Sequence, residues 1–274
     1  MTGSNADPPE IAHFGHRLDL ACQKYERFGE VWAHYLSRRP HRMEMDTDDD
    51  GFTRVRVVRR EPMPEELSLV FGEFLYHLRA ALDNCLYAVA VIDCGQRPPP
   101  NADKLEWPIC LNADAWSRQA RRYTMLSAPI RDALEAIQPY RAACPEWNCL
   151  RILHDLARVD RHRAMHFGTL YTSYGNATID RNRIADVEVH LGEVDEQAVV
   201  ATFRRLSDEP LDPEWFDLNV EFDVDVAGVV ESPHPTTGVI QRPWGSLSQR
   251  MRALHQAVLE YTHGLVQIAK DHHH

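Results

Sequence analysis

The stretch FGEFLYHLRAALDNCLYAVA, residues 71–90, has the apolar spacing of a long helix, but acidic and basic residues interrupt it: Glu73, His77, Arg79 and Asp83. A second stretch, LRILHDLARVDRHRAMHF at residues 150–167, has the same character. Its polar members include His154, Asp155, Arg158, Asp160, Arg161, His162, Arg163 and His166. A buried charge needs a partner, because an unpaired one is strongly destabilising. We therefore expect the two helices to face each other through one polar layer, which is the candidate site.

Apolar periodicity predicts the remaining elements outward from this pair. Long helices are expected at residues 11–38, 64–92 and 244–270, and shorter ones at 113–123, 127–138 and 145–167. A β-hairpin is expected at residues 41–60. From residue 169 the pattern changes to period two, which predicts four strands at 169–180, 185–194, 198–206 and 218–230. We expect Gly175 and Asn176 to form a hairpin turn between two strands, and Ser127 to cap the helix that follows it.

This order of elements lacks the alternation of strand and helix that a parallel sheet requires. The sequence therefore predicts an α+β fold, in which long antiparallel helices pack with a small antiparallel sheet and a C-terminal helix. We expect a single domain over residues 1–274. Residues 1–168 would be its mainly helical part, residues 169–243 its strands, and residues 244–270 its last helix.

Composition limits the classes of partner and the compartment. The chain has 30 basic and 41 acidic residues, so its formal net charge of −11 disfavours broad binding to nucleic acid. The six cysteines form no C-x-x-C pair, and several lie in apolar helical patterns, which is typical of free thiols in a reducing cytoplasm. No stretch approaches the roughly 18 uncharged apolar residues of a membrane span. We expect a cytoplasmic protein without a membrane partner.

The simplest interpretation of the polar layer is structural. Residues four apart share a helical face, so Glu73 lies with His77, and Arg79 lies with Asp83 on a neighbouring face. Arg79 would then pair with Asp155 or Asp160. Asp83 would pair with Arg161, His162 or Arg163. Such an ionic clamp between helices perturbs pKa values as an active site does, so it remains one alternative beside the chemical ones.

The stretch GEFLYHLRAALDN resembles the motif G-[DE]-x-[LI]-H-N-L-R-[SN]-A-L-D-H of a widespread family of uncharacterised bacterial proteins. ARVDRHRAM is similar to that family's second motif, D-K-H-R. The strand LNVEFDVDVA followed by one long helix also resembles that family, so the likeness extends over roughly residues 64–270. It implies a shared fold and no particular activity.

The first motif also resembles, more weakly, the R-x4-6-H signature of HEPN helical ribonucleases. That resemblance implies a homodimer in which an arginine and a histidine of each copy meet at the interface and act on RNA or a nucleotide. Arg79 matches the arginine, but Asn84 stands where the histidine is expected, and a carboxamide cannot act as an acid or base. Metal-independent cleavage would then depend on His77 or His162. Arg79, Asp83, Asp160 and Arg163 complete this catalytic set.

A metal centre is the competing chemical interpretation. Glu73 and His77 on one helix, with His162 and His166 on the other, supply a carboxylate and three imidazoles at helical spacing. A divalent ion such as iron, manganese or zinc would bind there, loosely as in di-iron helical bundles. The last alternative is a protein that binds a small molecule or a partner without catalysis, with the ionic clamp in a structural role.

Overall fold

The computed structural model describes residues 9–162, 167–190, 192–194, 198–207, 209–210, 212–226 and 229–272. The α-helices of this described part are α1 (Pro9–Ser37), α2 (Glu65–Cys94), α3 (Ala113–Gln119), α4 (Ala128–Ala136), α5 (Cys149–His162) and α6 (Leu247–His272). Its strands are β1 (His41–Thr47), β2 (Phe52–Arg59), β3 (Phe167–Ile179), β4 (Ile184–Val189), β5 (Gly192–Val194), β6 (Val199–Arg205), β7 (Phe216–Val226), β8 (Ser232–Pro233) and β9 (Ile240–Gln241).

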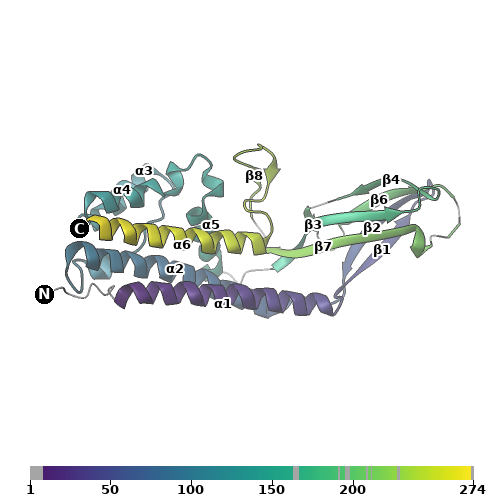
Figure 1. The fold of residues 1–274 in the computed structure, drawn as a ribbon. Coiled ribbons are helices and arrows are strands. Elements are labelled where there is room, and N and C mark those ends of the chain that lie inside the picture. Colours follow the sequence, from purple (N-terminus) through teal and green to yellow (C-terminus); the bar gives the residue numbers. More distant parts are fainter. Residues whose placement is uncertain are drawn as a thin grey trace.

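The helices and the strands occupy the two ends of an elongated molecule (Figure 1). α1, α2 and α6 run side by side as a bundle, α3 and α4 lie on the side of α6 away from α1, and α5 packs against both α2 and α6. The long strands extend from one end of this bundle, while α1 begins and α6 ends at the other end. None of the described helices is long and apolar enough to cross a lipid bilayer.

The long strands form two antiparallel sheets. The first has the order β1-β2-β6-β4, in which the β1-β2 hairpin pairs through β2 with β6. The second has the order β5-β3-β7 and is dominated by the pairing of β3 with β7. The short strands β8 and β9 pair with each other as a separate hairpin, which lies between β7 and α6 in the sequence. Helices and antiparallel strands in separate parts of the molecule confirm the predicted α+β fold.

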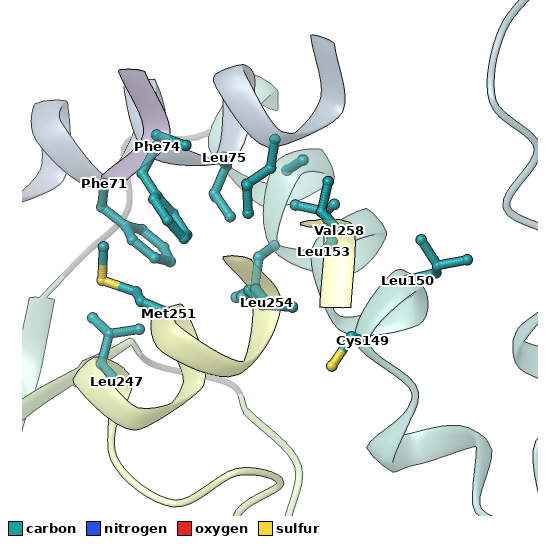
Figure 2. Close-up of a cluster of buried hydrophobic side chains, with 14 of the residues drawn as sticks. Phe71, Phe74, Leu75, Cys149, Leu150, Leu153, Leu247, Met251, Leu254 and Val258 are labelled. Atoms are coloured by element: carbon teal, nitrogen blue, oxygen red, sulfur yellow. The ribbon is translucent and has the colours of Figure 1, made fainter. Parts of the chain in front are cut away.

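The bundle core fills the space between α2, α5 and α6 (Figure 2). Phe71, Phe74 and Leu75 of α2 are almost completely buried, and their spacing of three and four residues places them on one helical face. They meet the apolar faces of α6 and α5, which contribute Met251, Leu254, Val258, Leu150 and Leu153. Burial of these large side chains supplies most of the free energy that holds the three helices together.

Most of the predicted elements are confirmed with small shifts at their ends, but four local predictions are wrong. The single strand expected at residues 185–194 is two strands, β4 and β5, which belong to different sheets. Gly175 and Asn176 form no turn, because β3 runs straight through them and pairs there with Val220 and Asn219 of β7. Ser127 makes no side-chain cap; its backbone N–H instead donates to Asp93 Oδ2 at 2.7 Å. The helix expected from residue 145 begins at Cys149, and the chain is already strand β3 at Phe167.

Candidate functional site

Glu73 and His77 share one face of α2, as their spacing predicts, but this face meets α1. Lys24 Nζ lies 2.6 Å from Glu73 Oε2, and Arg17 Nη1 lies 3.4 Å from His77 Nδ1. Burial lowers the pKa of His77, and the neighbouring charges of Arg17 and Lys24 lower it further. Two cationic side chains therefore occupy the positions at which Glu73 and His77 would hold a metal ion.

Arg79 and Asp83 lie on the opposite edge of α2, against the loop before α3. Arg79 Nη2 lies 3.4 Å from Glu106 Oε1, although only 17% of the Arg79 side chain is exposed. Asp83 Oδ1 accepts a hydrogen bond from Trp107 N at 2.8 Å. Burial raises the pKa of the Asp83 carboxyl, whereas this hydrogen bond and Arg79 lower it. Both residues therefore contact the 105–107 segment.

α5 approaches α2 at Asp160. Its carboxylate lies against Gly72, where a Cβ atom would be 2.8 Å from Oδ1. Burial raises the pKa of Asp160. Arg79 forms its ion pair with Glu106, and Asp155 lies 3.7 Å from Arg151 on its own helix, so the predicted pairing of Arg79 with Asp155 is wrong. The two motifs touch, but the described side chains do not form one layer of acids and bases.

Three members of the predicted site lie outside the described part of the structure. Arg163 and His166 belong to residues 163–166, which the structure does not describe, and the side chain of His162 is likewise not described. Within the described residues, no group of three or more histidine, cysteine, aspartate or glutamate side chains is arranged to hold a metal ion. The metal site and the histidine-dependent nuclease site both stay predictions at these positions.

A cleft of about 460 Å³ runs along the outer face of α5, and we call it the α5 cleft. α5 itself supplies one wall, which includes Asp155 and Arg158 of the second polar motif. The opposite wall comes from segments distant in sequence, among them Leu111, Val230 and Pro243. The full lining is Leu111, Glu146, Arg151, Ile152, Asp155, Leu156, Arg158, Val159, Val229, Val230, Pro243 and Arg250.

The arginine side chains of the α5 cleft differ in whether an acidic residue pairs with them. Arg151 Nη1 lies 3.1 Å from Glu146 Oε1, and Arg151 Nε lies 3.7 Å from Asp155 Oδ2, so its charge is balanced by two carboxylates. Arg158 is exposed and forms no ion pair with any described acidic residue. It is therefore the guanidinium group that the cleft offers to a ligand.

Arg250 forms the rigid inner wall of the α5 cleft. It is fully buried, with Nη1 2.7 Å from Asp225 Oδ1 and Nη2 3.3 Å from Asp225 Oδ2. Its other hydrogen bonds go to Pro243 O at 3.0 Å and Gly245 O at 2.7 Å. Arg242 Nη1 also donates to Asp225 Oδ2, at 2.6 Å. Burial raises the pKa of Asp225, and Arg250 opposes that rise.

The sequence prediction missed most of the α5 cleft. Arg250 carries the same signal as the predicted residues, because it lies on the apolar face of α6 that Leu247, Met251 and Leu254 define. Leu111 and Val230 carry no such signal, since exposed apolar residues in loops are common. Only the fold brings them to α5.

No family model matches the chain, and neither the curated proteins nor the solved structures gave a match.

Proposed function

We propose that this protein binds a small anionic, partly apolar molecule in the α5 cleft without transforming it. The observation that supports this proposal is the cleft itself, whose volume of about 460 Å³ falls within the roughly 300–1,000 Å³ of small-molecule sites. Seven of its twelve lining residues are apolar, and the other five are charged. Such a lining buries the body of a ligand and orients its polar group.

The positive charge of Arg158 is the reason why we expect an anionic ligand. A guanidinium group presents its N–H donors in a planar fork that matches a carboxylate, sulfonate or phosphate. Arg151 is already balanced by Glu146 and Asp155, and Arg250 is saturated by Asp225 and two carbonyl groups. Arg158 is thus the cleft residue whose donors are available to an incoming anion.

Binding without turnover is favoured by the residue types in the α5 cleft. Its described lining residues include no histidine, cysteine, serine or lysine. Arginine stays protonated and cannot transfer a proton near neutral pH. The two carboxylates of the lining, Glu146 and Asp155, both form ion pairs with Arg151. A carboxylate can act as a general base or nucleophile, but both carboxylates of the described cleft already contact Arg151, which favours recognition over catalysis.

A titration with two fluorescent probes tests this function. Anilinonaphthalene sulfonate carries an anionic group on an aromatic body, and phenylnaphthylamine has the same aromatic body without the anion. We expect Arg158→Gln to weaken binding of the sulfonate about tenfold, as the loss of one charge-assisted contact predicts, and to leave the neutral probe unaffected. Arg121→Gln, which removes an exposed arginine of another surface, is the matched control. Equal binding of the sulfonate to both variants would contradict the proposal.

A HEPN-like role in RNA or nucleotide processing is the second candidate. A surface hollow of about 280 Å³ supports it, because His13 of α1 lines this hollow together with Asn84 and Tyr87 of α2. An imidazole therefore stands beside the position at which the nuclease motif has its histidine. The ion pair of Arg79 with Glu106 counts against this role, since the motif's arginine would have to leave its carboxylate partner to reach RNA.

We also propose a reducing, cytoplasmic compartment for this activity. All six cysteines are free thiols. Burial raises the pKa of Cys110 to about 11 and that of Cys149 to about 12. Thiols with such pKa values stay protonated and unreactive at neutral pH, which is typical of structural cysteines in a reducing environment.

A further inference from the structure

The outer edge of β1 is an open strand edge. β1 pairs with β2 along its whole length, and no other described strand pairs with its second side. Its residues from Arg42 to Asp46 are exposed, and Met43 and Met45 show 38% and 42% of their surface. The strand contains neither proline nor lysine; its charged residues are Arg42, Glu44 and Asp46, which discourage pairing with a partner unless their charges are matched. This edge can therefore accept a further strand whose charges match.

The hydrogen bonds of the hairpin identify which residues face the open edge. Asp48 N donates to Phe52 O at 3.0 Å, and Arg60 N donates to Pro40 O at 2.7 Å. The backbone groups of a strand point to alternate sides, so the even-numbered residues of β1 bond to β2. His41, Met43, Met45 and Thr47 consequently direct their N–H and C=O groups toward the open edge.

Two copies of β1, HRMEMDT, have complementary side chains when they run antiparallel with Glu44 of one opposite Glu44 of the other. In this two-fold symmetric pair Arg42 of each copy lies opposite Asp46 of the other, and Met43 of each copy lies opposite Met45 of the other. Directly opposite residues share a face of the sheet, so the ion pairs form on one face and the methionine contacts on the other. The two Glu44 side chains also meet. Within one chain Arg42 already contacts Glu44, and Arg56 Nη1 lies 3.8 Å from Asp46 Oδ2, so the Arg42–Asp46 contacts between copies would extend these exposed pairs into a network.

We propose that β1 pairs antiparallel with β1 of a second copy of this chain, centred on Glu44, and so joins the two four-stranded sheets. This register brings odd-numbered residues opposite odd-numbered ones, so the unpaired backbone groups of both copies face each other. Because the bundle and the strands of one copy lie end to end (Figure 1), the two bundles would stand at opposite ends of the joined sheet. The contact is short, which predicts a weak, concentration-dependent dimer. It is independent of the α5 cleft.

Sedimentation of charge variants of the full chain tests this register. Arg42→Asp and Asp46→Arg each place like charges opposite each other at two positions, so each should raise the dimer dissociation constant about tenfold or more. In an equimolar mixture the opposing charges become complementary again, and association should return. Arg204→Asp makes the same charge change on β6, away from the edge, and should leave the dimer unchanged.

Met43→Pro separates edge pairing from folding. The N–H of Met43 points away from β2, so this substitution removes a donor of the open edge without removing a hydrogen bond inside the sheet. We expect loss of the dimer with an unchanged circular dichroism spectrum. A wild-type chain that is monomeric at its highest soluble concentration would overturn the proposal. So would a dimer that survives both charge variants, or a mixture of the two that fails to associate.

Discussion

The carboxylate of Asp160 packs against Gly72 of α2. The Gly72 backbone is helical, so the glycine is not required by its conformation. A Cβ atom at this position would lie 2.8 Å from Asp160 Oδ1 and 2.9 Å from Oδ2, which is closer than real Cβ atoms approach oxygen. The glycine therefore provides the space that lets α5 and its acidic residue dock on α2.

Gly72→Ala should destabilise the protein because the new methyl group displaces the Asp160 carboxylate. Overpacking of this kind costs about 1–3 kcal/mol, which exceeds the gain of up to about 1 kcal/mol from replacing a helical glycine by alanine. Urea unfolding measures the net loss. Gly29→Ala in α1 is the matched control, since its Cβ would meet nothing within 4 Å, and it should leave stability unchanged or raise it. Equal effects of the two substitutions would show that Asp160 does not crowd Gly72.

Single residues also show how far spacing can predict a site. The four-residue spacing of Glu73 and His77 placed them on one face, and both do face the same helix. Spacing contains no information about which neighbour covers that face. The neighbour is α1, with Lys24 and Arg17, rather than α5, because the packing of the three long helices decides it. Helical periodicity therefore predicted the face correctly but not its partner.

At the scale of elements, aromatic side chains join α1 to β1. The His41 ring packs at 5.7 Å from the ring of Tyr35 in α1 and at 5.6 Å from that of Phe222 in β7. Its Nε2 is buried and has no hydrogen-bond partner among the described residues. Burial lowers the pKa of His41 to about 4, and Arg59 contributes to the same direction. His41 is therefore neutral at pH 7 in its contacts with Tyr35 and Phe222, and we call this aromatic contact between α1, β1 and β7 the His41 joint.

This joint should make folding stability depend on pH. In the unfolded chain His41 becomes protonated as the pH falls below the ordinary histidine pKa of 6.5, whereas in the folded chain it stays neutral until about pH 4. Protonation therefore favours the unfolded state, and the free energy of unfolding decreases as the pH falls from 6.5 to about 4. His41→Phe keeps the aromatic contacts without the titration. We expect urea unfolding to show a smaller loss of stability from pH 7 to pH 5 in this variant than in the wild type. The same loss in both proteins would mean that His41 is protonated in the folded state.

The carboxylate of Asp225 joins β7 to the start of α6. It bonds to the buried Arg250 and Arg242, and its neighbour Asp223 accepts a hydrogen bond from Ser248 Oγ at 2.7 Å. Removing one member of such a buried group leaves the others without compensation. These contacts therefore connect the end of β7 to the first turns of α6.

Asp225→Asn should lower the free energy of unfolding by about 3–5 kcal/mol, because it leaves two buried guanidinium groups facing a neutral amide. Glu209→Gln is the control, since it disrupts the exposed ion pair with Arg183 and should cost no more than about 1 kcal/mol. Chemical unfolding of both variants at pH 7 measures the difference. Comparable losses would show that Asp225 contributes no more than a surface pair.

At the scale of the whole molecule, the change in hydrophobic period near residue 169 was enough to predict the α+β class. The positions of α1, α2 and α6 and of the β1-β2 hairpin followed from local patterns. Gly175 and Asn176 were mispredicted because pairing with β7, more than 40 residues away in sequence, outweighs their local preference for a turn. The α5 cleft could not be predicted for the same reason, since Leu111, Val230 and Pro243 meet α5 only in the folded chain. The division into one domain stays a prediction.

Binding in the α5 cleft is the central claim, and a crystal of the protein soaked with bromobenzoate tests it most directly. The bromine atom gives an anomalous signal that locates the probe independently of the protein. We predict one ordered site, with the bromine among Ile152, Leu156 and Val230 and the carboxylate at hydrogen-bonding distance from Arg158. An empty α5 cleft together with an ordered probe elsewhere on the surface would contradict the account.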